Sequence, residues 1–234
     1  MTMERRAFLE KAAALGAGLF AASEACSREK AVPSNPGTSR IKAAGPEVIE
    51  LVQFEKDSTF TLEHALVNRS SDRSFIEERL SEDNISRLLW AMTGVNRPNG
   101  HRTTPSAVAK YPVDVYVCIP EGTYMYETKN HRLVRVLSED IRRNVPTIQP
   151  GLKRAAMTIV YVANVDKVPG GEKTIRFADI EIGCMVQNLY LSAASLGLGS
   201  CVFGLVKYGK VSELLGLKDD QLVRIAQAVG PIKK

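Results

Sequence analysis

Residues that build metal sites, stacking surfaces or membrane spans are scarce in this chain of 234 residues. It contains three histidines, four cysteines and one tryptophan, and aromatic residues make up 6% of the sequence. No CxxC, HxxxH or HExxH spacing occurs, so we expect no dedicated metal site. The longest nearly uncharged apolar run covers residues 12–23, which is shorter than the roughly 20 residues that a membrane-spanning helix requires. The sequence therefore excludes a polytopic membrane protein.

The charge pattern lacks the features of a nucleic-acid-binding protein. The sequence has 31 basic and 26 acidic residues, which gives a net charge of +5. The basic residues are scattered and form no stripe with interleaved aromatics, so we expect no nucleic-acid partner. Hydrophobic residues (44%) and charged residues (24%) occur in the proportions of an ordinary soluble globular domain. We expect one folded domain that buries its own core without disulfides or metals.

Residues 1–25 have the pattern of an export signal. Arg5-Arg6 precede Phe8-Leu9, a mild apolar stretch rich in Ala and Gly follows, and small residues stand three and one positions before Cys26. The paired arginines resemble the twin-arginine signal, which exports proteins that have already folded, often around a cofactor. The alternative is an amphipathic N-terminal helix, although no amphipathic period runs through residues 12–22. We predict a twin-arginine signal peptide and a periplasmic or otherwise exported protein.

Residues 26–45 are predicted to be a flexible linker. Pro33, Pro36-Gly37 and Gly45 interrupt this stretch, which has little apolar content. Cys26 would become the first residue after cleavage and is a candidate for lipid attachment, although Ser23 and Glu24 match a lipoprotein signal poorly. The folded domain is expected to cover residues 46–234.

The spacing of apolar residues predicts a mixture of helices and strands. Helices are expected at Thr61–Arg69, Asn84–Gly94, Ala178–Leu196 and Lys210–Leu215, with a short helix from Ser138 to Asn144. Strands are expected at Val113–Ile119, Thr123–Tyr126, Leu133–Val136, Met157–Ala163, Cys201–Val206 and Leu222–Val229. Because the elements follow no strict βαβ rhythm, the predicted class is α+β with a mixed or mostly antiparallel sheet.

Two arginines and several hydroxyl groups occur together in the segment Arg69-Ser70-Ser71-Asp72-Arg73-Ser74-Phe75. Guanidinium groups and serine hydroxyls are the donors that a phosphate monoester needs. The alternative is a solvated polar loop in which Asp72 pairs with either arginine. This segment alone leaves both interpretations open.

Two further segments would let backbone approach a ligand closely. The segment at 102–107 holds a proline followed by two small residues. The segment at 197–204 holds Gly197, which a helix cap explains, and Gly199 and Gly204, which would let the chain pass close to a planar ligand. No GxGxxG opens a helix here, so this is not a dinucleotide fingerprint.

Taken together, these segments resemble the nitroreductase superfamily of FMN-dependent oxidoreductases. The pattern Arg-x-Ser-x-Arg-x-Phe at 69–75 is similar to the phosphate-binding segment of that family. The runs at 88–94, 102–107 and 111–117 are more specific and are similar to the SagB-type branch, which includes thiazoline and oxazoline dehydrogenases. The resemblance extends from about Thr61 to the C-terminus. It implies a mostly antiparallel central sheet flanked by helices, and a homodimer in which the long helix lies at the interface.

The resemblance also implies which residues would hold FMN. Those expected at the phosphate and the ribityl chain are Arg69, Ser71, Arg73 and either Lys233 or Lys234. Those expected at the flavin ring are Pro105, Ser106 and Ala107 from the partner subunit, Gln149 at the pyrimidine edge, and the backbone amides of Phe203 and Gly204 near N5 and O4. Such amides would stabilise the reduced, anionic flavin. No residue is expected to be an obligatory acid or base.

The implied reaction is a ping-pong transfer of hydride or electrons through FMN, to or from a small organic substrate such as a nitroaromatic, a quinone or an azoline. NAD(P)H is the usual donor of the family, but it is scarce outside the cytoplasm. Two departures from the family pattern concern the substrate pocket: Ala109 stands where many relatives have Asn, and Val108 where a small residue is common. The alternatives are a flavin-binding scaffold without turnover and a periplasmic binding module without flavin.

Overall fold

The computed structural model describes residues 47–54, 60–168 and 170–233. The predicted signal peptide, the linker and Lys234 lie outside the described residues. The strands are β1 (Val48–Glu50), β2 (Val113–Ile119), β3 (Gly122–Glu127), β4 (Arg132–Leu137), β5 (Met157–Asn164), β6 (Gly199–Phe203) and β7 (Gln221–Gly230). The described α-helices are α2 (Leu62–Asn68), α3 (Glu82–Thr93), α4 (Arg176–Ser195) and α5 (Tyr208–Leu215). Within this part of the chain, no helix is long and apolar enough to cross a membrane.

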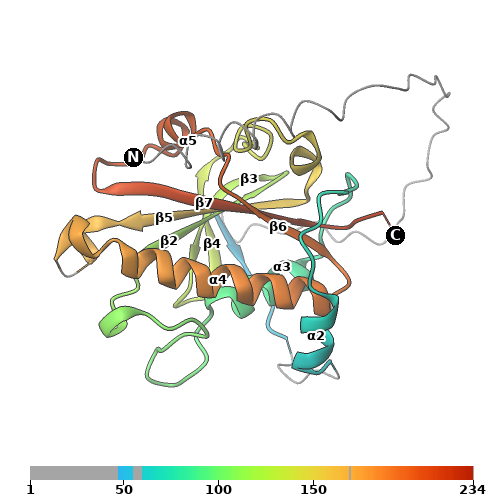
Figure 1. Cartoon of the computed structure of the whole chain (residues 1–234), viewed down its shortest axis with the longest axis horizontal. Helices are drawn as coiled ribbons and strands as arrows, with labels where there is room; N and C mark the ends of the chain where they lie inside the picture. The colour runs from blue at the N-terminus through green and yellow to red at the C-terminus, as the bar shows by residue number, and fades with distance from the viewer. Residues whose placement is uncertain (1–46, 55–59, 169, 234) are drawn as a thin grey trace, which may run out of the picture. The chain divides into compact units, whose positions relative to one another are not determined.

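The strands form one seven-stranded sheet in the order β1-β4-β3-β2-β5-β7-β6, and every neighbouring pair is antiparallel. Helices α3 and α4 lie on one face of the sheet, and α5 lies on the other (Figure 1). This arrangement confirms the predicted α+β class with a mostly antiparallel sheet flanked by helices.

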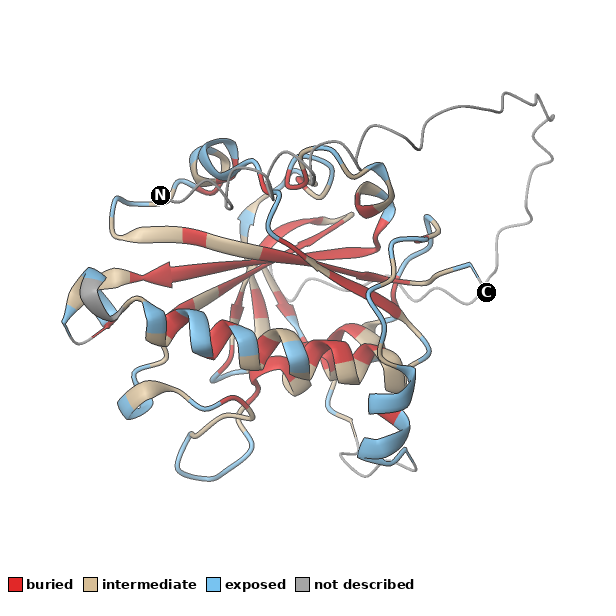
Figure 2. Cartoon of the chain, in the orientation of Figure 1, coloured by how far each residue is buried: buried red, intermediate tan, exposed pale blue. Residues whose placement is uncertain are grey.

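Alternation along the central strands divides the core into two layers. Val113, Val115 and Val117 of β2 point towards α3 and α4, whereas Tyr116 and Cys118 point towards α5. Both faces of β2 and β5 are therefore buried, as Figure 2 shows. Strands with two covered faces lie in the middle of a sheet, which explains the continuous apolar sequence of β5.

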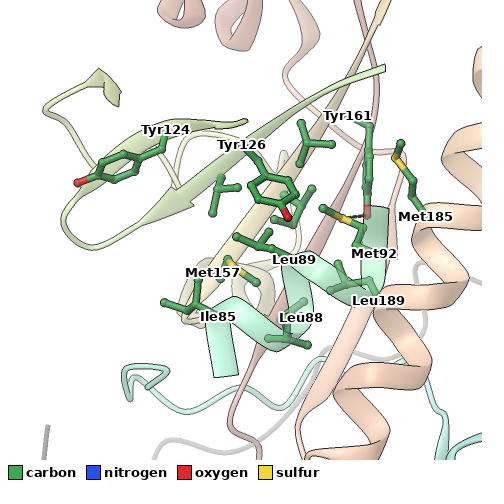
Figure 3. Close-up of a cluster of buried hydrophobic side chains, with 14 of the residues drawn as sticks. Ile85, Leu88, Leu89, Met92, Tyr124, Tyr126, Met157, Tyr161, Met185 and Leu189 are labelled. Atoms are coloured by element: carbon green, nitrogen blue, oxygen red, sulfur yellow. Dashed lines mark hydrogen bonds between the residues drawn. The ribbon is translucent and has the colours of Figure 1, made fainter. Parts of the chain in front are cut away.

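The layer beneath α3 and α4 is packed mainly with aliphatic and sulfur-containing side chains. Leu88, Leu89 and Met92 of α3 meet Met185 and Leu189 of α4, and all are fully buried (Figure 3). Burying a side chain of this size contributes about 1.5–3 kcal/mol to folding, so this layer fixes how α4 crosses the sheet.

The end of α4 sets the direction in which β6 begins. Gly197 adopts a left-handed backbone with a φ of 68°. The nitrogen of Leu198 donates to the Ala193 carbonyl at 2.9 Å, and the nitrogen of Gly197 donates to the Ala194 carbonyl at 3.1 Å. These two bonds form a Schellman motif, so Gly197 ends the helix as predicted.

Two predicted elements are wrong in part. Residues 138–144 form a turn and not a helix, because Asp140 accepts hydrogen bonds from the backbone and the guanidinium of Arg142, and Arg142 also donates to the carbonyls of Ala155 and Ala156. Such local side-chain bonds compete with a helix. The strand predicted at 201–206 ends at Phe203, and Val206 makes an isolated bridge to Pro146 instead. The short edge strand β1 was not predicted.

Candidate functional site

Three segments that lie far apart in the sequence meet at the outer edge of β6. The nitrogen of Asp72 donates to the Ser200 carbonyl of β6 at 2.9 Å. The nitrogen of Lys233 donates to the Ser74 carbonyl at 3.2 Å, and Phe75 pairs with Ile232. The segment at 69–75, the start of β6 and residues 231–233 thus form one unit, which we call the cationic cradle.

The cradle brings together most of the residues predicted to hold a phosphate. Arg69, Ser71 and Arg73 lie on one segment, and the backbone of Lys233 runs beside it. Among the described residues, none of these three cations has a carboxylate within ion-pair distance. Asp72 instead accepts a hydrogen bond from the nitrogen of Ser74 at 2.7 Å. Asp72 therefore forms no ion pair with either arginine, and the cradle carries more positive than negative charge.

Most other arginines in the described chain are ion-paired. The pairs are Arg79–Glu121, Arg87–Asp83, Arg132–Glu127, Arg142–Asp140, Arg143–Glu77 and Arg224–Asp179. Five further arginines also lie outside the ion pairs of the described chain: Arg97, Arg102, Arg135, Arg154 and Arg176. The cradle differs from them because it gathers several such cations on adjacent segments, an arrangement that would suit an anion.

Close backbone approach explains two glycines around the cradle. A Cβ at Gly199 would lie 3.1 Å from the Cβ of Asp72 and would overlap Ile232. A Cβ at Gly151 would overlap the carbonyl oxygen of Arg73. The atoms that crowd Gly199 belong to the chain itself, and an added Cβ at Gly204 would meet nothing within 4 Å, so the predicted approach to a planar ligand stays a prediction.

A second part of the site lies beyond the C-terminal end of β6, beside a loop that leads to Gln149. The nitrogen of Thr147 donates to the Leu205 carbonyl at 3.0 Å, and Pro146 pairs with Val206. This pairing places the chain that leads to Gln149 beside the chain that leaves β6 after Phe203 and Gly204. The side-chain oxygen of Gln149 is buried and has no hydrogen-bond partner among the described residues.

Large apolar side chains are exposed around this second part of the site. Ile148, Leu205 and Tyr208 are 74%, 51% and 43% exposed. Apolar side chains beside a buried polar acceptor suit a planar heterocycle with a polar edge.

The remaining predicted residues lie in a loop that packs against α3 and α4. Thr104 donates to the Met92 carbonyl at 2.5 Å and accepts from Asn188 at 3.3 Å, which anchors the loop at 105–107 against α3 and α4. Ser106 accepts from the nitrogen of Tyr111 at 2.8 Å. One chain therefore does not bring Pro105, Ser106 and Ala107 to its own cradle. That they serve the site of a partner subunit remains a prediction.

The loop that follows Pro105–Ala107 has an unusual backbone. Val108, Ala109 and Tyr111 have φ values of 46°, 55° and 47°. This left-handed region is disfavoured for residues with a Cβ, and most of all for a β-branched residue such as Val108. The conformation explains why a small residue suits position 108, and it shows that surrounding contacts hold the loop in a strained form.

Glu181 lies behind this loop, on the first half of α4, and sequence reasoning did not single it out. It is 1% exposed, and neither carboxyl oxygen has a hydrogen-bond partner of normal geometry within the described chain. Burial raises the pKa of Glu181 to about 7, and the nearby Ser106 and Arg102 oppose the rise. Arg102 stacks on Tyr111 with its guanidinium carbon 4.2 Å from the ring centre, and burial lowers its pKa.

A sequence model of the nitroreductase family matches residues 66–231. The chain belongs to the nitroreductase family. A nitroreductase-family protein of Methanocaldococcus jannaschii is 30% identical over 183 residues, which cover 74% of this chain and 92% of that protein. Proteins of this family are generally FMN-dependent oxidoreductases, so membership supports an oxidoreductase activity and makes FMN the expected cofactor.

Solved structures share the nitroreductase fold. A crystal structure of a nitroreductase-family protein from Ralstonia eutropha JMP134 has a TM-score of 0.74 at 31% identity, covering 87% of this chain and 100% of that one. A chain of the Escherichia coli microcin synthetase complex has a TM-score of 0.64 at 20% identity, covering 100% of this chain and 95% of that one. At that identity, the second comparison shows a common fold alone. Among the described residues, no cluster of three or more His, Cys, Asp or Glu side chains could hold a metal.

The left-handed backbone at Val108 should lower the stability of the folded protein. Val108→Gly should raise the free energy of unfolding by about 1 kcal/mol, because glycine adopts a left-handed backbone without a steric cost. Urea denaturation measures this change. Val67→Gly is the matched control, because Val67 is also exposed but lies in a helix, where glycine should destabilise. A destabilised Val108→Gly variant would show that the loop is not strained.

The raised pKa of Glu181 should make the stability of the folded protein depend on pH. Its pKa is higher in the folded protein than in the unfolded chain, so between about pH 4.5 and 7 the folded form keeps a proton that the unfolded form has lost. Stability should therefore fall as pH rises through this window, by about 1–3 kcal/mol for this group.

Glu181→Gln should remove this fall, so the variant should gain stability over wild type at pH 8 and gain much less at pH 5. Denaturation curves at the two pH values measure the difference. Glu213→Gln, on a side chain that is 71% exposed, should keep the wild-type pH dependence. Parallel pH profiles for Glu181→Gln and wild type would contradict the assignment.

Proposed function

We propose that this nitroreductase-family chain is an FMN-dependent oxidoreductase that works as a homodimer with a flavin site at each interface. The observation that carries the proposal is the cationic cradle. Arg69, Arg73 and Lys233 come together there without carboxylate partners, beside the hydroxyl of Ser71. A doubly charged phosphate monoester matches this set of donors in charge and in hydrogen bonding.

The residues beyond β6 fit the flavin ring. The buried oxygen of Gln149 lacks a donor in the described chain and would accept a hydrogen bond from the pyrimidine N–H. The backbone amide of Gly204, just beyond β6, would donate to the polar edge where negative charge develops, whereas the amide of Phe203, also predicted to donate there, faces β7 within the sheet. The apolar side chains of Ile148 and Leu205 would exclude water from the ring.

FMN, when bound, supplies reversible two-electron transfer. The chain has to bind the phosphate, orient the ring and leave one ring face open to a small organic substrate. This division of labour agrees with the prediction that no side chain is an obligatory acid or base. The proposed cycle is ping-pong, with donor and acceptor using the same face in turn.

The exposed apolar surface along α2 and α4 supports the homodimer. Leu62, Leu66 and Val67 of α2 and Ile180 of α4 are each at least half exposed. Two open hollows of about 490 and 600 Å³ run beside these helices. A second copy packed along α4 would cover this surface. Its loop at 105–107 would then line the flavin of the first copy.

The proposed substrates are nitroaromatics, quinones or azoline-like compounds, and the motifs at 88–94, 102–107 and 111–117 favour the SagB-type dehydrogenase branch. The leader supports export by the twin-arginine route to the periplasm, with Cys26 as a candidate lipid anchor. Export with bound cofactor would explain why a flavin protein carries such a leader.

The visible spectrum of the purified full-length protein tests the cofactor assignment. We expect a yellow protein whose retained flavin is FMN. Arg69→Ala with Arg73→Ala should lose most of this flavin, because both variants remove charge from the phosphate site, where each charged hydrogen bond contributes about 1.5–3 kcal/mol. Arg79→Ala with Arg143→Ala removes the same charge from ion-paired surface arginines and should retain flavin.

Each alternative has its own outcome in this experiment. A colourless wild-type protein would favour a binding module without flavin and would overturn the proposal. A yellow protein whose flavin is reduced by dithionite and reoxidised in air, but which consumes no organic substrate, would favour a scaffold without turnover. Unchanged flavin retention in the double arginine variant would refute the phosphate site.

Gln149 provides a test that separates binding from folding. Gln149→Leu removes a buried acceptor without a partner, so it should stabilise the flavin-free protein by about 1 kcal/mol. The same change should weaken FMN binding, because the ring loses its acceptor. Denaturation of the apo form and flavin titration measure the two effects. Weaker binding together with lower apo stability would mean that Gln149 is a structural residue.

A further inference from the structure

Tyr190 lies where three parts of the cationic cradle meet. It belongs to α4 and is 5% exposed. Its hydroxyl oxygen lies 2.7 Å from the backbone nitrogen of Val202 and 3.0 Å from Oγ of Ser71. Its ring centre lies 5.4 Å from the guanidinium carbon of Arg69. One buried side chain therefore links α4, the outer edge of β6 and the segment that carries both arginines.

The hydroxyl of Tyr190 limits how far that segment pairs with β6. Ser71 pairs with Ser200 in parallel, and the nitrogen of Asp72 donates to the Ser200 carbonyl. The next amide that faces outward from this edge, that of Val202, donates to Tyr190 and not to a backbone carbonyl. The pairing therefore stops after one residue, and the chain turns away from the strand at Arg73.

The same hydroxyl determines which way the Ser71 proton points. Tyr190 accepts from Val202, and its own buried proton needs an acceptor, for which Ser71 Oγ lies in place. Ser71 then accepts from Tyr190 and keeps its proton free to donate away from Tyr190. Since Ser71 is exposed on the cradle, that proton is available to a bound anion.

The ring of Tyr190 also positions the guanidinium of Arg69, the second hydrogen-bond donor of the cradle that Tyr190 contacts. A guanidinium within about 6 Å of a tyrosine ring centre is attracted by its electron-rich face. Arg69 has this contact and no carboxylate partner in the described part of the chain. Its position is therefore set by Tyr190 before any ligand binds.

We propose that Tyr190 is a positioning residue that makes the site select a phosphorylated flavin over the unphosphorylated one. It does not touch the ligand, and it acts through Ser71 and Arg69. The inference rests on the proposed FMN site and adds to it the residue that orders the phosphate donors. The relevant measurement is the ratio of the dissociation constants for riboflavin and FMN, which isolates the contribution of the phosphate.

The test uses the full-length protein freed of flavin, titrated with FMN and with riboflavin by quenching of flavin fluorescence. Tyr190→Phe keeps the ring but removes the hydroxyl. We expect the dissociation constant for FMN to rise about tenfold, as for a lost charge-assisted hydrogen bond, while that for riboflavin stays unchanged. Ser71→Ala should lower the ratio similarly, and the double variant should show no further loss, because Tyr190 acts through Ser71.

Tyr124→Phe is the matched control. Tyr124 is buried in β3, accepts a hydrogen bond from Arg135 at 3.1 Å and donates to the Glu121 carbonyl at 3.3 Å. The guanidinium carbon of Arg135 also lies 5.4 Å from its ring centre. It thus repeats the contacts of Tyr190 away from the cradle, so its loss should affect stability and leave the binding ratio unchanged.

Three results would overturn the inference. Equal weakening of FMN and riboflavin in Tyr190→Phe would show a general structural role, and additive losses in the double variant would show that Tyr190 does not act through Ser71. If Tyr190→Phe fails to fold, Ser71→Ala still tests the inference: an unchanged ratio of the riboflavin and FMN dissociation constants in that variant would also overturn it. Wild-type protein that binds FMN no more tightly than riboflavin would instead refute the proposed phosphate site itself, before any variant is compared.

Discussion

The functional half of the molecule depends on how the outer edge of β6 is paired. β6 is the last strand of the sheet, so its outward-facing amides and carbonyls need partners from elsewhere. Asp72 supplies one backbone amide, and the hydroxyl of Tyr190 supplies an acceptor. Because these bonds hold the segment at 69–75 against the sheet, main-chain pairing places the backbone of Arg69 and Arg73, and the ring of Tyr190 then positions the guanidinium of Arg69. Residues 231–233 continue from β7 to the same place, which adds Lys233.

This pairing has an electrostatic consequence. Like charges gathered at one site repel, and elsewhere in the described chain arginines are commonly offset by a carboxylate. In the cradle, the nearest carboxylate, that of Asp72, is used to bind the amide of Ser74. Asp72 thus forms no ion pair with the cations, and three cations and one carboxylate leave the cradle with a net positive charge. A bound phosphate would remove that repulsion, so ligand binding and stability should be coupled at this site.

Sequence alone predicted the parts of the fold that local pattern determines. The alternation of Val113, Val115 and Val117 indicated β2, whereas the Arg-x-Ser-x-Arg pattern alone left a phosphate site and a solvated loop both open. Tyr190 gave no such signal, because its partner Ser71 lies 119 residues away and no local pattern relates the two. The left-handed turn after Ala107 was also not predicted. Valine and alanine disfavour a left-handed backbone, so the sequence gives no sign of a turn that tertiary contacts impose.

The two halves of α4 differ in whether their buried polar side chains have hydrogen-bond partners, and this difference bears on the proposed homodimer. In the second half, the hydroxyl of Tyr190 has both a donor and an acceptor, and all the segments that form the cradle belong to one chain. In the first half, Glu181 is buried without a hydrogen-bond partner among the described residues, beneath the strained loop at 108–111. Buried groups that lack partners cost free energy, and strained loops persist when their surroundings hold them. Under the proposed homodimer, residues 105–107 serve the flavin of a second subunit, and the unpartnered carboxyl group of Glu181 lies at that end of α4.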